Sequence, residues 1–143
     1  MDSTDTRLLQ ALARNARASV SDLARSLDLA RSTVQTRLEK LERDGTIAGY
    51  SLRLGEHAAA ARIRATVLLQ ISPRAAPALL SRLRAMPEVE RAHSSSGRFD
   101  LILQLAAETT TALDETLDRI GAFDGVTRSE SLIHLATKID RAI

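Results

Sequence analysis

The chain has 143 residues, which is enough for one ordinary domain or two small ones, and its formal net charge is +2. It has no cysteine, which excludes disulfides and thiol nucleophiles, and its three aromatic residues are too few for a surface that stacks single-stranded bases. Because no signal leader and no apolar run of roughly 20 residues is present, we expect a cytoplasmic protein without membrane contact.

Apolar spacing predicts three helices in the first 45 residues. The first covers residues 5–15, where leucines recur on one helical face. Ser19 is followed three residues later by Asp22, a pattern typical of a capping box, so we expect a second helix to begin there. The chain therefore opens with at least two short amphipathic helices.

A tight turn and a third helix follow. Asp28 is a residue type that tolerates the left-handed backbone conformation, and it precedes a third amphipathic stretch over residues 31–43. After Gly45 the period changes to two, which predicts a strand or wing over residues 47–54. This order is that of a winged helix-turn-helix, in which the third helix enters the major groove of DNA.

Burial of Val34, Leu38 and Leu41 leaves polar side chains on the outer face of the third helix. Arginine can donate two hydrogen bonds to guanine, glutamine can pair with adenine, and hydroxyls can contact base edges or phosphates. For residues on the flanks, the alternatives are phosphate contact or a salt bridge to Glu39 or Asp44. The candidate DNA-binding residues are Arg31, Ser32, Thr33, Gln35, Thr36, Arg37 and Lys40.

The charge distribution agrees with a DNA-binding N-terminal half, although the same helix could be an ordinary solvated surface helix. Residues 1–55 carry 9 Lys and Arg against 7 Asp and Glu, whereas residues 56–143 carry 11 of each. The net positive charge therefore lies entirely in the N-terminal half, where a double-stranded DNA partner is expected.

The second half predicts a ferredoxin-like βαββαβ domain, so the fold class is α+β. Strand and helix patterns alternate over residues 63–143, after a linker or short helix at residues 55–62. The segments 83–89 and 120–126 each place an apolar residue, a turn and Val at the same spacing, which indicates a repeated half-domain. We expect a DNA-binding domain at residues 1–54 and an effector-binding, oligomerising domain at residues 63–143.

Helices on one face of such a sheet leave the other face uncovered. A second copy of the chain is the simplest cover, which predicts a homodimer. The residues expected on the open face are Thr66, Leu68, Ile102, Gln104, Ile133 and Leu135.

Six stretches carry a pattern of motifs in a fixed order and spacing. They are residues 5–12, 17–24, 32–42 and 44–50, the Gly-x-x-Asp pattern at Gly97–Asp100, and Gly125-Val126 before the last strand. Together they resemble the leucine-responsive/asparagine-responsive (Lrp/AsnC, feast/famine) family of transcriptional regulators. The resemblance covers nearly the whole chain.

The resemblance implies dimers that assemble further to tetramers or octamers, with an amino acid or a related small effector bound between subunits. An aspartate can hold the ammonium of an amino acid, while hydroxyls, backbone N–H groups or an arginine hold its carboxylate. Without the resemblance, a plain hairpin turn capped by Asp100 is the simpler interpretation. The effector-binding candidates are Ser94, Ser96, Gly97, Arg98 and Asp100.

Two further functions stay open, and one feature departs from the family. Decarboxylases of sirohaem-type tetrapyrroles share the architecture and would use His93 and His134, but this chain lacks the aromatic residues expected of them. A constitutive, ligand-independent organiser of DNA is the other alternative. We expect no enzyme activity, cofactor or metal, because the three histidines show no ligand spacing. Ala30 stands where the family usually has a serine that caps the third helix.

Overall fold

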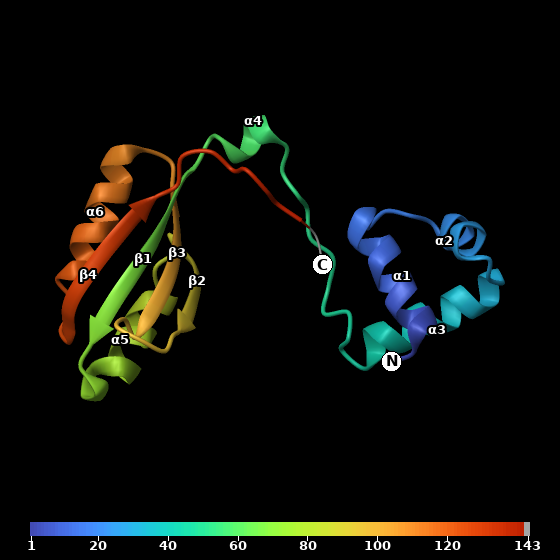
Figure 1. Ribbon diagram of the computed structural model, residues 1–143, viewed down its shortest axis with the longest axis horizontal. Helices are drawn as coiled ribbons and strands as arrows, with labels where there is room; N and C mark the ends of the chain where they lie inside the picture. The colour runs from blue at the N-terminus through green and yellow to red at the C-terminus, as the bar shows by residue number, and fades with distance from the viewer. Residues whose placement is uncertain (142–143) are drawn as a thin grey trace. The chain divides into compact units, whose positions relative to one another are not determined.

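The computed structural model describes residues 1–141. Contacts divide the chain into an N-terminal unit, residues 1–53, and a C-terminal unit, residues 54–138, each with its own hydrophobic core (Figure 1). Among the described residues, no helix is long and apolar enough to cross a lipid bilayer.

The N-terminal unit contains three helices, as the sequence predicts. They are α1 (Ser3–Arg14), α2 (Val20–Leu27) and α3 (Arg31–Arg43). Capping boxes begin both α1 and α2, because Asp2 accepts a hydrogen bond from the Asp5 N–H and Ser19 accepts one from the Asp22 N–H. The inward faces form one core, made of Leu8, Leu12, Leu23, Ala24, Leu27, Val34 and Leu41.

The turn between α2 and α3 depends on Asp28. Its backbone is left-handed, with φ 55° and ψ 54°, as predicted from its residue type. Leu29 follows, donates its N–H to the Ala24 carbonyl over 2.9 Å and packs against the core. On the other side of the turn, Arg7 of α1 donates to the Leu27 carbonyl over 3.2 Å. The turn is thus fixed from both sides, as a helix-turn-helix requires.

The segment after α3 differs from the prediction. Residues 47–54 are irregular and pair with no strand among the described residues, although their apolar alternation predicted a strand. A strand needs a partner for its N–H and C=O groups, and the single chain offers these residues none. Leu52 is 83% exposed, and the other apolar side chains of the alternating face, Tyr50 and Leu54, are exposed as well. The alternation therefore marks an apolar edge that the single chain does not cover.

The C-terminal unit has the predicted βαββαβ order. A short helix, α4 (Glu56–Ala59), precedes the first strand, and the last strand ends at Ile133. The elements are β1 (Ile63–Ile71), the 3₁₀ turn η1 (Pro73–Ala75), α5 (Ala76–Arg84), β2 (Val89–Ser94), β3 (Leu101–Ala107), α6 (Thr110–Gly121) and β4 (Val126–Ile133).

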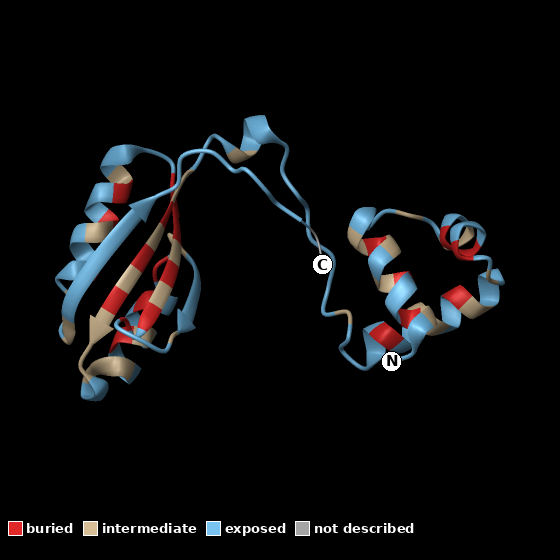
Figure 2. Ribbon diagram, in the orientation of Figure 1, coloured by how far each residue is buried: buried red, intermediate tan, exposed pale blue. Residues whose placement is uncertain are grey.

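The four strands form one antiparallel sheet in the order β2-β3-β1-β4. This is the strand order of the ferredoxin-like fold, with β1 and β3 in the centre. Figure 2 shows buried and half-buried residues alternating along β1 and β3, while β2 and β4 are mostly exposed. The two central strands therefore carry the core of this unit.

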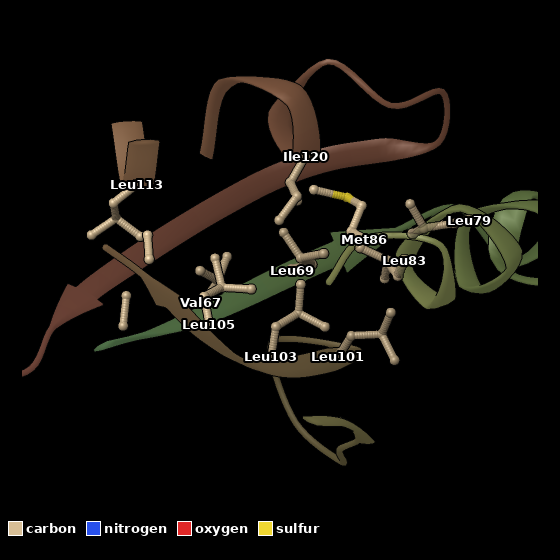
Figure 3. Packing of buried hydrophobic residues seen from close by; sticks show 12 residues of the cluster. Val67, Leu69, Leu79, Leu83, Met86, Leu101, Leu103, Leu105, Leu113 and Ile120 are labelled. Carbon is tan, nitrogen blue, oxygen red and sulfur yellow. The ribbon is translucent and has the colours of Figure 1, made fainter. Parts of the chain in front are cut away.

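One face of the sheet packs on α5 and α6. Val67 of β1 faces the helices together with its paired residue Leu103 of β3. Figure 3 shows these side chains with Met86, which follows α5, and with Leu113 and Ile120 of α6. Burial of each such side chain contributes about 1.5–3 kcal/mol. The buried members are Ala65, Val67, Leu69, Leu79, Leu83, Met86, Leu101, Leu103, Leu105, Ala107, Leu113 and Ile120.

The opposite face of the sheet is open, and its composition corrects one prediction. Thr66 of β1 pairs with Gln104 of β3 and with Leu132 of β4, so Leu132 shares the open face with them. Ile133 pairs with Ala65 and therefore lies on the helix side, contrary to the prediction, while Leu135 lies beyond the end of β4. The apolar members of the open face are Leu68, Ile102 and Leu132.

Gly125 directly precedes β4, at a crowded point. Its φ is +91°, and its carbonyl accepts a hydrogen bond from the Ser72 N–H over 2.8 Å. A Cβ on Gly125 would overlap the Cβ of Ala75. The position thus requires glycine both for its backbone conformation and for its close approach to η1.

We expect Gly125→Ala to lower the free energy of unfolding by at least about 1–3 kcal/mol, because it combines left-handed strain with overpacking. Urea denaturation measures the change. Gly121→Ala is the matched control, since Gly121 has no heavy atom within 4 Å of an added Cβ and no positive φ. Equal stability of the two variants would contradict this account of Gly125.

Candidate functional site

The outer face of α3 carries the predicted polar residues. Val34 and Leu41 are buried, and this fixes which side of the helix faces solvent. Thr33 and Arg37 are half-buried on the flank of that face. The fully exposed candidates are Arg31, Ser32, Gln35, Thr36 and Lys40. All seven candidate residues thus lie on the solvent face or on its flank.

The amide of Gln35 has an intrahelical partner. Its Nε2 donates to Oε1 of Glu39, one turn later, over 3.0 Å. Both side chains are exposed, so this hydrogen bond forms and breaks in solvent at little net cost. Gln35 can therefore turn its amide toward another donor-acceptor pair.

Arg37 is held by carboxylates of α1 and its N-cap. Its Nη1 lies 2.7 Å from Oδ2 of Asp2 and 2.9 Å from Oδ1 of Asp5. The sequence predicted a phosphate contact or a salt bridge to Glu39 or Asp44, and the salt bridges that form are to Asp2 and Asp5 rather than to Glu39 or Asp44. The hydrogen bond from Arg37 lowers the pKa of Asp2, and the same carboxylates raise the pKa of Arg37. Sequence reasoning missed both aspartates, because they lie 35 and 32 residues from Arg37.

The first turn of α3 is electrically positive. Its N-cap is Ala30, which makes no side-chain cap hydrogen bond, and the turn contains no acidic residue. The first backbone N–H groups of the helix therefore remain available to solvent or to an anion. Arg31 adds a positive charge at the same end.

The second candidate region is the connection between β2 and β3. Ser94 ends β2, and the loop closes when the Ser95 N–H donates to the Asp100 carbonyl over 3.0 Å. The Ser95 hydroxyl donates to the Phe99 carbonyl over 2.7 Å. Gly97, at the tip, has a φ of +108°. The loop is thus a tight turn with a glycine at its one left-handed position.

Asp100 ties this loop to the end of β1. Its N–H donates to the Leu69 carbonyl over 2.8 Å, and its Oδ2 accepts from the Ile71 N–H over 2.9 Å. Gln70 adds a third bond, from its Nε2 to the Arg98 carbonyl over 2.7 Å. The sequence analysis did not identify Gln70 or Ile71, because only the strand pairing brings them to the loop.

The loop presents groups of both charges to solvent. Arg98 and Asp100 are exposed, and so are Ser96 and Gly97, which directly precede Arg98. Among residues 1–141, the recorded hydrogen bonds of the Asp100 carboxylate involve Oδ2, so its other oxygen can accept from a ligand. An exposed anion, a cation and a hydroxyl within seven residues can hold a small zwitterion.

Two histidines of the sheet were candidates for a tetrapyrrole site. His134 lies beside Thr66, with 2.7 Å between its Nε2 and the Thr66 hydroxyl, while His93 pairs with Ile102 across β2 and β3. His93 lies on β2 and His134 directly follows β4, and both residues are exposed.

Two family models match the chain. Residues 1–48 match a model described as winged helix-turn-helix DNA-binding, and residues 64–143 match the Lrp/AsnC ligand binding domain. The first match covers the three helices, and the second covers the sheet with α5 and α6.

Known proteins match along nearly the whole chain. The regulator LrpA of Mycobacterium tuberculosis is 35% identical over 141 residues, which is 96% of this chain and 91% of LrpA. A transcriptional regulator of Neisseria meningitidis, solved in complex with L-methionine, superposes with a TM-score of 0.89 at 25% identity, covering 99% of this chain and 94% of that one. A feast or famine regulatory protein of M. tuberculosis, complexed with L-methionine, gives a TM-score of 0.81 at 33% identity, covering 97% and 95%.

The missing cap of α3 generates a prediction. We expect Ala30→Ser to raise the free energy of unfolding by about 1 kcal/mol, because the serine hydroxyl accepts a hydrogen bond from a first-turn N–H. Denaturant unfolding of the whole chain measures the change. Ala60→Ser, at the exposed C-cap position of the short α4, is a control without an expected gain. A stability of Ala30→Ser equal to that of wild type would contradict the account of the uncapped helix.

Proposed function

The chain belongs to the Lrp/AsnC family of DNA-binding transcriptional regulators, and we propose that it reads specific duplex sequences through the outer face of α3. The observation that carries this proposal is the helix-turn-helix geometry. The left-handed turn at Asp28 and the burial of Val34 and Leu41 leave a polar row facing solvent. Arg31, Gln35 and Thr36 would contact base edges, while Ser32, Thr33 and Lys40 would contact phosphates or bases.

The active form would be a homodimer that covers the open face of the sheet. Leu68, Ile102 and Leu132 lie on this face with the polar pair Thr66 and Gln104, and α5 and α6 cover only the other side. A second sheet packed on this face would bury these apolar side chains. Two copies of α3 would then read the two halves of a pseudo-palindromic site. Dimers would associate further to tetramers or octamers.

The effector would be an amino acid or a related small metabolite, bound at the β2–β3 loop between subunits. The solved regulators that contain L-methionine support this class of ligand. Asp100 would hold the ammonium group, and Arg98 with the hydroxyls of Ser94 and Ser96 would hold the carboxylate. Gly97 would let the backbone approach the ligand closely. Such a ligand regulates only if it binds two assemblies with different affinity.

A titration against the promoter region flanking the protein's own gene tests the DNA-binding proposal. We expect tight, salt-sensitive binding, and we expect Arg31→Ala and Gln35→Ala to lose about 10- to 100-fold on the specific duplex, because each removes a base contact. Both variants should bind an unrelated duplex almost like wild type. Arg84→Ala, an exposed arginine of α5, is the matched control. Equal binding of all variants to the promoter would remove α3 from the proposal.

A thermal-shift panel of amino acids, beginning with L-methionine, tests the effector proposal. A ligand at 100 times its Kd stabilises the folded state by about 2.7 kcal/mol, so the melting temperature should rise. Asp100→Asn should abolish the rise and keep the fold, because the amide oxygen can still accept from the Ile71 N–H. Asp114→Asn on α6 is the control. A wild-type protein that responds to no amino acid would instead support a ligand-independent organiser of DNA.

A further inference from the structure

A hollow of about 460 Å³ adjoins the outer face of α3 and the N-terminal end of α1. It is open to solvent and lies entirely within the N-terminal unit. Three hydroxyls and two cations line it, together with two carboxylates. The lining residues are Asp2, Asp5, Ser32, Thr33, Thr36, Arg37 and Lys40.

Most of these groups match the chemistry of a phosphate. Hydroxyls, an ammonium and a guanidinium are the side-chain donors that most often bind backbone phosphates of DNA. The two carboxylates do not fit that role, since they repel a phosphate. They instead occupy the guanidinium of Arg37, through Oδ2 of Asp2 at 2.7 Å and Oδ1 of Asp5 at 2.9 Å. Among residues 1–141, both of these bonds come from Nη1, so the remaining guanidinium donors can bind a further anion.

The two carboxylates differ in how firmly they are placed. The Asp5 side chain is 10% exposed, whereas the Asp2 side chain is 55% exposed. The two carboxylate oxygens of Asp2 have different partners. Oδ1 accepts the capping hydrogen bond from the Asp5 N–H, and Oδ2 accepts from Arg37. The contact of Oδ2 with Arg37 can therefore break without loss of the helix cap. Asp5 stays with Arg37 as its structural partner.

We propose that this hollow binds a phosphate of the DNA backbone, and that Oδ2 of Asp2 occupies the phosphate's place on Arg37 until DNA displaces it. The proposal rests on the proposed role of α3 in DNA binding. Arg37 is then a phosphate ligand as well as the link between α3 and α1. The Asp2 carboxylate weakens binding to any duplex, because it must leave Arg37 and stay close to a phosphate. The effect is independent of base sequence.

Asp2→Asn isolates the charge, because asparagine is as good an N-cap as aspartate and its amide oxygen can keep the bond to the Asp5 N–H. DNA-binding titrations of the full chain over a range of salt concentrations are the measurement. We expect Asp2→Asn to bind several-fold tighter than wild type on specific and unrelated duplexes alike. Its plot of log affinity against log salt should be steeper by up to about 0.9, the value for one neutralised phosphate charge, because the variant removes one negative charge from the site.

Asp22→Asn is the control, because Asp22 is an exposed carboxylate of the α2 capping box, at its third helical position rather than its N-cap, and pairs with Arg25 rather than Arg37. The second variant is Arg37→Gln, alone and combined with Asp2→Asn. We expect Arg37→Gln to reduce the affinity and the salt slope, and to cancel the gain from Asp2→Asn in the double variant. Thermal unfolding of each variant separates these effects from loss of fold.

The outcomes distinguish this proposal from the function on which it rests. If wild type binds DNA and Asp2→Asn matches Asp22→Asn in affinity and salt slope, the phosphate site is wrong while the regulator proposal stands. The same holds if the gain from Asp2→Asn persists in the double variant, because the gain then does not pass through Arg37. If wild type binds no duplex at all, the proposed role of α3 fails, and the phosphate site fails with it.

Discussion

The C-terminal unit depends on the double pairing of β1. This strand bonds antiparallel to β3 on one edge and to β4 on the other, so its carboxyl end meets the beginnings of both. Asp100 reaches Leu69 and Ile71 for that reason, and Gly125 reaches Ser72 just beyond the strand. The shape of the β2–β3 loop is therefore set by the central strand more than by the six residues of the loop itself. A loop bonded in this way offers fixed groups to a ligand, and ordering them on binding costs little entropy.

In the N-terminal unit, the packing and the ion pairs keep the polar face of α3 exposed to solvent. Its apolar stripe determines which side of α3 is buried, but packing of leucine and valine has little directional preference. The bonds from Arg37 to Asp2 and Asp5 are directional, and they link α3 to the beginning of α1. The bond to Asp2, whose side chain is 55% exposed, contributes to the orientation of α3 more than to stability. The same guanidinium stands at the edge of the polar face, so one residue serves both the fold and the surface.

What could be predicted from the sequence was local. Ser19 and Asp22 lie three residues apart, and Asp28 is a residue type that tolerates the left-handed backbone conformation. The second helix and the turn after it could therefore be predicted. The failures are all non-local. Leu132 and Ile133 are both apolar, so periodicity could not decide which faces the helices, and the pairing to β1 decides it. The partners of Arg37 and Asp100 lie about 30 residues away, at distances that spacing does not encode. The strand predicted within residues 47–54 does not form in the single chain, because alternation indicates an apolar face without indicating which strand would pair with it.

The anchoring of the loop also constrains how an effector could act. Asp100 and Gln70 bind the loop to backbone and side chain of β1, so moving it would break hydrogen bonds at the centre of the sheet. A ligand that gains only a few kcal/mol from two charges and a hydroxyl cannot offset that loss and still bind. In the proposed function, the ligand-dependent change would therefore lie between copies of the chain rather than inside one. The loop would act as one wall of a site that a second copy completes, and the effector would favour the assembly in which both walls are present. Because a dimer would carry two copies of α3, a change in assembly would change which half-sites can be bound together, with no change in α3 itself.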